Sequence, residues 1–223
     1  MEYLKRGYIY EGEYDNVSGS CYGIIFMAQL AGAVAALLFY WDKPLPLHLK
    51  LITYTFFAEM IAMWLQMVYL TALKDYKSIF VSYFAGAAIS IVLTWLNLQY
   101  GFMAPVEGTM LSMCIGVGIL DLCFMVQIVR YFGYPSHAMN FEFLPYFEQH
   151  YKLFLLIIFY TLSIYVANFI VWNSSWGVMV AGTYLYSPRY DVITFYAFLS
   201  ILPIMIMFVV SMELKFYEQY AIY

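Results

Sequence analysis

The sequence predicts an all-α polytopic membrane protein with about six transmembrane helices. Hydrophobic residues make up 65% of the 223 residues and charged residues only 11%, and the mean hydropathy is +0.75. A soluble domain has about half apolar and about a quarter charged residues, so a soluble fold would lack the polar surface to cover this chain. The charges are few, sum to −4 and form no basic stripe, which argues against a nucleic-acid-binding protein.

Six apolar runs are long enough to cross a bilayer, which takes about 20 helical residues. Charged residues, Pro or Gly bound each run: Trp41–Pro44 closes the first, and Lys74–Lys77 separates the second from the third. The predicted spans are 21–41, 48–72, 78–98, 108–132, 151–172 and 190–214.

The basic residues favour an orientation with both ends of the chain in the cytoplasm. Seven of the ten lie on the side of the N-terminus and three on the other side, and cytoplasmic loops carry an excess of Lys and Arg. We therefore expect a cytoplasmic N-terminal segment 1–20, a four-helix transmembrane part 21–132, an amphipathic cytoplasmic connector 133–150, and a two-helix transmembrane part 151–223 with a cytoplasmic end.

Two carboxylic acids stand out inside the predicted spans. Glu59 follows Phe57 and Ala58 in the second span, and Asp121 lies between Leu120 and Leu122 in the fourth. A carboxylate at the centre of a bilayer costs about 2.5–3.5 kcal/mol on insertion scales, so such a residue usually faces the interior of a bundle or water. Each residue is either a coupling or pathway site, or a neutral acid that bonds to a neighbouring helix.

Metal binding and covalent catalysis find little support in the sequence. His48, His137 and His150 lie in loops or at span edges, and the chain has no HExxH motif. No Gly-rich phosphate-binding loop is present, and no Ser, His and acid are placed so that a shared site is predicted. We expect neither a metal, nor a cofactor, nor a catalytic residue.

Several stretches, each at the edge of a predicted span, resemble in the same order the Pel-type exopolysaccharide exporters of bacteria. The closest resemblance is in Leu70–Lys77, which matches a Leu-Ser-Ala/Gly-Leu-Lys-x-Tyr-Lys loop. The other stretches are Tyr10–Gly23, Phe141–Leu144, Tyr186–Pro203 and Glu213–Tyr220. The resemblance covers nearly the whole chain.

This resemblance implies an exporter related to flippases and multidrug-extrusion proteins. Such exporters have about twelve spans in two bundles, and this chain corresponds to the middle half. The implied function is export of an exopolysaccharide or a lipid-linked glycan across the bacterial inner membrane by alternating access, with the bilayer, a glycosyltransferase and other membrane subunits of a polysaccharide-synthesis complex as partners. The cytoplasmic edge that the motifs define comprises Lys74, Asp75, Tyr76, Lys77, Glu213, Phe216, Tyr217 and Tyr220.

The chain departs from the family pattern in its fifth predicted span. Family members have a Trp-x-Asp-Lys-x-x-x-Trp pattern there, and this chain has Ala167 and Asn168 in place of the two charges and keeps Trp172. The candidate coupling or pathway residues are accordingly Glu59, Asp121, Asn168 and Asp191. The candidate aromatics that would face a glycan are Tyr165, Trp172, Tyr184, Tyr186 and Tyr190, each of which is otherwise an interfacial anchor.

Two other classes of function stay open at this point. A non-transporting subunit that scaffolds a larger membrane complex would also have few intramembrane charges and many aromatics. A membrane enzyme that acts on lipids or prenyl carriers would need Glu59 or Asp121 to converge with further acids or His on one cavity. A water-filled polar cavity between helix bundles would favour transport over scaffolding.

Overall fold

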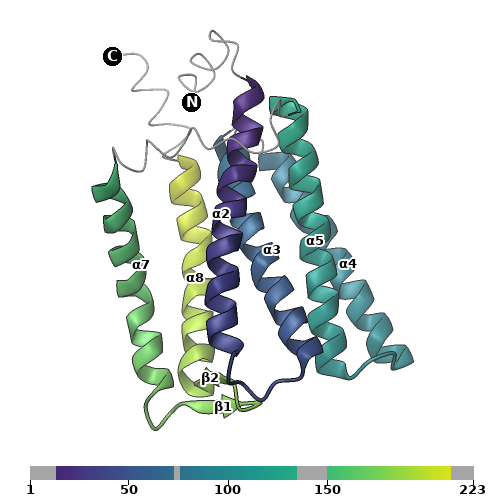
Figure 1. Cartoon of the computed structure of the whole chain (residues 1–223), viewed down its shortest axis with the longest axis vertical. Coiled ribbons are helices and arrows are strands. Elements are labelled where there is room, and N and C mark those ends of the chain that lie inside the picture. Colours follow the sequence, from purple (N-terminus) through teal and green to yellow (C-terminus); the bar gives the residue numbers. More distant parts are fainter. Residues whose placement is uncertain (1–13, 73–75, 135–149, 212–223) are drawn as a thin grey trace. The chain divides into compact units, whose positions relative to one another are not determined.

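The computed structural model describes residues 14–72, 76–134 and 150–211 of the chain. Figure 1 shows the helices and strands of these residues and their order along the chain. The elements are α2 (Tyr14–Tyr40), α3 (Leu47–Ala72), α4 (Tyr76–Tyr100), α5 (Pro105–Phe132), α7 (Tyr151–Trp172), β1 (Val178–Val180), β2 (Tyr184–Tyr186) and α8 (Pro188–Ser211). They form two compact units, Met1–Tyr151 and Lys152–Tyr223.

The apolar runs of the sequence become the membrane helices. Five helices of the described chain are long and apolar enough to cross a membrane: α2, α3, α4, α5 and α7. They coincide with the first five predicted spans, and the prediction of an all-α polytopic membrane protein is confirmed. The sixth predicted span is helical too, as the 24-residue α8 with Pro203 inside it, but α8 is not among these five.

In the first unit, α5 packs along α3 and α4 and also contacts α2, while α2 packs on α3. The crossing of α4 and α5 depends on glycines. A Cβ added to Gly86 would lie 2.7 Å from the carbonyl oxygen of Gly116, and a Cβ added to Gly116 would lie 2.7 Å from that of Gly86. Only residues without a side chain allow two helix backbones to approach so closely.

The ends of α5 follow from local sequence. Pro105 occupies the first turn, where its missing N–H leaves no bond unmade. Glu107 lies in the first turn and Arg130 in the last, each on the side that the helix dipole favours. Gly133 ends the helix with a φ of 81°, a conformation that glycine adopts readily. Ser18 of α2 donates a hydrogen bond of 3.2 Å to the carbonyl of Gly133.

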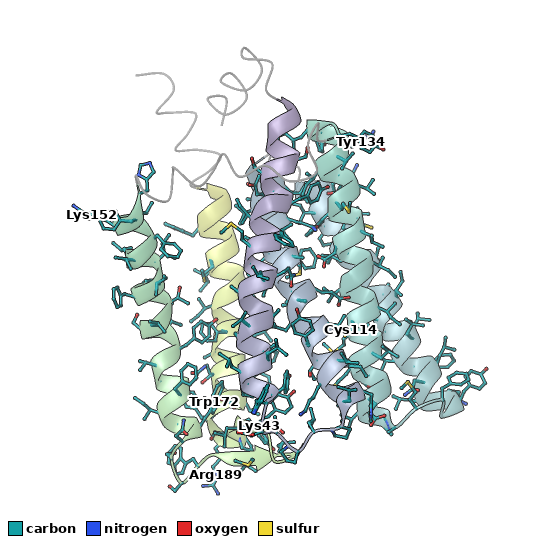
Figure 2. The ribbon with its side chains drawn as sticks, viewed as in Figure 1. Lys43, Cys114, Tyr134, Lys152, Trp172 and Arg189 are labelled. Atoms are coloured by element: carbon teal, nitrogen blue, oxygen red, sulfur yellow. The ribbon has the colours of Figure 1, made fainter. Side chains whose placement is uncertain are left out.

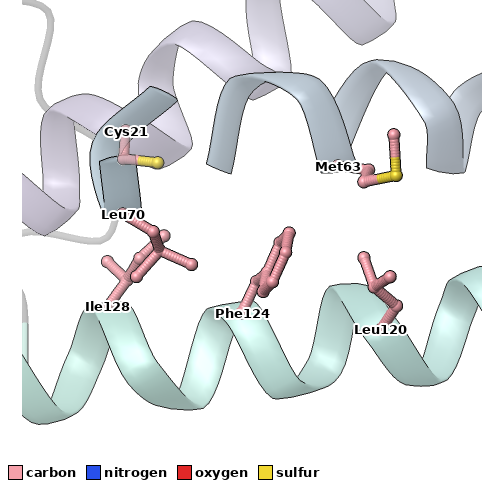
Figure 3. Close-up of a cluster of buried hydrophobic side chains, with 6 residues drawn as sticks. All are labelled: Cys21, Met63, Leu70, Leu120, Phe124 and Ile128. Atoms are coloured by element: carbon pink, nitrogen blue, oxygen red, sulfur yellow. The ribbon is translucent and has the colours of Figure 1, made fainter. Parts of the chain in front are cut away.

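The buried core of the first unit lies between α2, α3 and α5 (Figure 3). On α5, Leu120, Phe124 and Ile128 repeat every four residues, so they share one helix face. The edge of the Tyr83 ring packs on Phe124, with 5.7 Å between the ring centroids. The complete cluster consists of Cys21, Met63, Leu70, Leu120, Phe124 and Ile128.

The second unit consists of α7, a short β-hairpin and α8. α7 is apolar around its circumference and has no buried residue, as expected for a helix whose surface meets lipid. The sequence analysis did not predict the hairpin. Its strands pair antiparallel, with Val178 opposite Tyr186 and Val180 opposite Tyr184. The turn places Ala181 and Gly182 at φ values of 51° and 62°.

Candidate functional site

The two intramembrane carboxylic acids of the sequence lie on α3 and α5, which pack against each other. Glu59 is at the middle of α3, and Asp121 is beyond the middle of α5. Gly118, one turn before Asp121, gives Glu59 room to approach α5: a Cβ at Gly118 would lie 3.1 Å from Oε1 of Glu59. The sequence could single out each acid, and the structure places the Glu59 carboxyl against α5 one turn from Asp121; we call the two acids the Glu59–Asp121 pair.

The surroundings of this pair are mostly apolar. Oε2 of Glu59 and Oδ1 of Asp121 are buried and accept no hydrogen bond from the described part of the chain. The Tyr83 hydroxyl of α4 lies 3.5 and 3.4 Å from the sulfurs of Met63 and Met67 and can donate its one hydrogen to either. Sulfur is a weak acceptor. Two ionised carboxylates that lay close together in a medium of low dielectric constant would repel each other.

Sequence reasoning missed three residues around the pair: Tyr83, Cys114 and Gly118. The Cys114 thiol donates to the Ile52 carbonyl of α3 at 3.4 Å. Cys114, Gly118 and Asp121 are spaced by four and three residues, which puts them on one face of α5. That spacing was the signal in the sequence. No group of three or more His, Cys, Asp or Glu in the described ranges is arranged to hold a metal ion.

Other polar side chains of the first unit make bonds that hold its helices together. Gln127 of α5 donates to Oγ of Ser82 on α4 at 2.7 Å and to the Ser78 carbonyl at 3.3 Å. The Asn97 side chain, at the end of α4, accepts a bond of 3.0 Å from the backbone N–H of Met103. These bonds explain why amides are tolerated at these positions, although Oε1 of Gln66 and Oε1 of Gln127 are, like the oxygens of the two acids, buried without a partner in the described ranges. Glu59 and Asp121 differ from these amides in being acids.

A second polar cluster joins α7 to α8 in the other unit. The indole N–H of Trp172 lies 3.0 Å from both carboxylate oxygens of Asp191, and the backbone N–H of Ser187 donates to Oδ2 of Asp191 at 2.8 Å. Figure 2 labels Trp172 and Arg189, which belong to the two ends that this cluster joins. Asp191 also lies in the first turn of α8, where the helix dipole favours negative charge. We call Trp172, Ser187 and Asp191 the α7–α8 clasp.

The other candidate residues of this unit are distributed along it. Tyr165 on α7 and Tyr186 on β2 are exposed, with exposed fractions of 53% and 40%. Tyr184 shares the face of β2 with Tyr186, because side chains two apart on a strand point the same way. Tyr190 and Asn168 are half-buried.

Most of the predicted cytoplasmic edge lies outside the described residues. Tyr76 and Lys77 begin α4 and are exposed. Nearly all of the predicted connector 133–150 also lies outside them. The residues of the predicted edge that the structure does not describe are Lys74, Asp75, Glu213, Phe216, Tyr217 and Tyr220.

A family model described as "PelG: Putative exopolysaccharide Exporter (EPS-E)" matches residues 7–223. The chain belongs to this family. The resemblance to Pel-type exporters that the order of the span-edge motifs indicated is thereby confirmed, and the chain is a multi-pass membrane protein of the PelG family. No curated protein and no solved structure matches it.

Proposed function

We propose that this PelG-family protein exports an exopolysaccharide, or a lipid-linked glycan, across the bacterial inner membrane by alternating access, and that Glu59 and Asp121 couple this transport to a proton or a monovalent cation. The family match supports export. The observation that carries the coupling role is that the Glu59 carboxyl lies against α5 one turn from Asp121, and that each acid has a buried oxygen without a partner in the described ranges. Intramembrane acids of this kind mark proton and ion pathways.

The position of the pair fits a coupling role. The two acids lie on different helices, so any movement of α3 along α5 changes the distance between their carboxyl groups. A ligand can shift a conformational equilibrium only if it binds the two states with different affinity. A shared proton or cation meets that condition, because it offsets the repulsion best when both carboxyl groups are close.

For the glycan, we propose contact with the aromatic residues of the second unit. The C–H faces of sugar rings are apolar and stack on aromatic rings. Tyr165 and Tyr186 are exposed enough to offer a face to a ligand, and Tyr184 lies beside Tyr186 on the same strand face. In this proposal Asp191 acts as a positioning residue, because its carboxylate holds the indole of Trp172.

We further propose that both ends of the chain face the cytoplasm, where a glycosyltransferase and other subunits would dock. The excess of basic residues on that side supports this orientation. Lys77, exposed at the start of α4, would then be accessible from the cytoplasm. A cysteine introduced at Lys77 should react with an impermeant maleimide in inside-out vesicles and not in intact spheroplasts. The opposite pattern would reverse the orientation.

Secreted polymer measured at matched membrane levels of the protein tests the coupling role. Glu59→Gln should lower export at least tenfold, because an amide cannot exchange a proton at that position. Glu107→Gln is the matched control. This carboxyl lies in the first turn of α5 and pairs with His48 at 3.1 Å, and its replacement should leave export intact. Unchanged export by Glu59→Gln across a range of pH would exclude coupling. If Glu59→Gln left export unchanged but deletion of the whole chain abolished it, the protein would act as a scaffolding subunit.

A further inference from the structure

An apolar groove with a volume of about 410 Å³ lies between the C-terminal end of α2 and the start of α3. Its walls include Ala33 and Leu37 on α2, Trp41 just after the end of α2, and Leu51 and Tyr54 on α3, with Lys50 among them. The volume is within the range of about 300–1,000 Å³ that is typical of small-molecule sites. The groove belongs entirely to the first unit.

Polarity changes along this groove in one direction. From Ala33 to Trp41 it follows about 12 Å of α2, at 1.5 Å per residue, from within the span to its end. Lys50 is the only charged residue in its wall, and it lies near the start of α3, level with the end of α2. The groove is therefore apolar over its length and cationic at the end that lies at the membrane surface.

The ammonium group at this end is held in place. Nζ of Lys50 donates to the carbonyl of Tyr40 at 2.9 Å, and the Tyr40 hydroxyl forms a bond of 2.8 Å with Oγ1 of Thr53. An ammonium carries three donors, so this bond leaves two of them for an anion. In the adjoining turn, Lys43 lies over the Phe39 ring at 5.7 Å and follows Asp42, and His48 of α3 pairs with Glu107 of α5 at 3.1 Å.

The groove opens outward from the four-helix unit. Leu37, Trp41 and Leu51 are 68%, 81% and 56% exposed, although they lie on or beside helices that are long and apolar enough to cross a membrane. The outward surface of such helices meets lipid chains. An ammonium group forms charge-assisted hydrogen bonds with phosphate oxygens. The groove thus offers a wall for an acyl chain and a cation for a phosphate.

We propose that this groove binds one anionic phospholipid of the bilayer, with an acyl chain between α2 and α3 and its phosphate on Lys50. A prenyl phosphate carrier shares this chemistry, but the position of the groove at the lipid-facing surface favours the phospholipid. The site is separate from the Glu59–Asp121 pair, and its occupancy can be measured without measuring export.

Binding to the delipidated full chain in detergent tests the proposal. Phosphatidylglycerol should raise the unfolding temperature more than phosphatidylcholine with the same chains, because only the former carries a net negative charge for Lys50. Inorganic phosphate alone should have no effect, since it cannot use the apolar wall. A prenyl phosphate serves as a third ligand, and we expect it to bind more weakly than phosphatidylglycerol.

Matched variants separate the two parts of the site. Lys50→Gln should weaken phosphatidylglycerol binding about tenfold, the effect of losing one charge-assisted hydrogen bond, and Lys50→Arg should largely restore it. Ala33→Phe should fill the groove and weaken both phospholipids, and Ala36→Leu, a smaller change in the same wall, serves if Ala33→Phe fails to fold. The controls are Lys77→Gln and Ala87→Phe, both exposed on α4.

Three results would overturn the proposal. The first is equal binding of phosphatidylglycerol and phosphatidylcholine by the unchanged protein. The second is a Lys50→Gln protein that binds phosphatidylglycerol as tightly as the Lys77→Gln control. The third is binding of inorganic phosphate or prenyl phosphate that matches or exceeds binding of phosphatidylglycerol.

Discussion

In the α2–α5 unit the helices contact each other along small and polar side chains deep within the spans, whereas in the α7–α8 unit the hydrogen bonds between the helices lie at one end. α5 buries seven residues, among them Gly116 at its crossing with α4. α7 buries none, and the bonds that tie it to α8 connect Trp172 with Asp191. The helices of the first unit are held together by contacts along their length, and those of the second by the α7–α8 clasp.

The contrast follows from what a bilayer supplies. Lipid chains are as apolar as Leu, so apolar side chains alone give membrane helices little reason to associate, and close glycine contacts and hydrogen bonds do so instead. The first unit has both kinds of contact along its spans, so substitutions inside it should affect the whole unit. Substitutions in the clasp should act on the adjoining loop.

The largest effect is expected at the crossing of α4 and α5. Gly116→Leu places a side chain where a Cβ alone would already lie 2.7 Å from the backbone of α4. Overpacking costs about 1–3 kcal/mol where neighbours can move, and here the neighbour is backbone, so we expect the upper end or more. Unfolding of the purified protein should show this loss, while Ala87→Leu, exposed on α4, should be near neutral. Equal stability of the two variants would contradict the close crossing.

A smaller and local effect is expected at the clasp. Asp191→Ala leaves the Trp172 indole N–H and the Ser187 backbone N–H without their acceptor. Such a loss costs about 1–3 kcal/mol for a buried donor, and less for the indole of Trp172, which is half-buried. Hydrogen exchange should rise over residues 173–187 and stay unchanged in α2–α5. Arg189→Ala, an exposed neighbour, is the control. Faster exchange in α5, or none in the loop, would show that the clasp does not act locally.

The smallest effect is expected at a bond between spans. Gln127→Leu removes the hydrogen bonds to Ser82 and Ser78. Such bonds in membrane proteins average about 0.6 kcal/mol and reach about 1.7 kcal/mol. The substitution should therefore lower the free energy of unfolding by an amount of that size. Gln99→Leu, exposed on α4, should not change it. A loss comparable to that of Gly116→Leu would mean that polar bonds, rather than glycine packing, dominate the first unit.

The sequence was a good guide to the helices and to the family, and a poor one to contacts. Apolar runs located α2–α5 and α7, because length and hydropathy determine a span. Glu59 and Asp121 were visible as single acids, but their meeting depends on how α3 and α5 are rotated, which their weak periodicity does not reveal. In the sequence, Gly118 was the one sign that the side chain of Glu59 could lie close to α5.

The second unit shows a different limit. Residues 173–187 contain no charge and read as a short uncharged link between two spans, and the hairpin within them depends on a turn at Ala181 and Gly182. The bond between Trp172 and Asp191 joins two residues that flank that hairpin in the sequence. Both residues were predicted to be functional, but no local pattern in the sequence predicts that one holds the other.

The central claim is that Glu59 and Asp121 act as one coupling site in an exporter. A double-mutant cycle on secreted polymer tests it most directly, with Glu59→Gln, Asp121→Asn and both together at matched membrane levels. Residues that act as a unit are non-additive, so the account predicts that each single change lowers export about as much as the pair. Losses that multiply in the double variant, or export that all three leave unchanged, would contradict the claim.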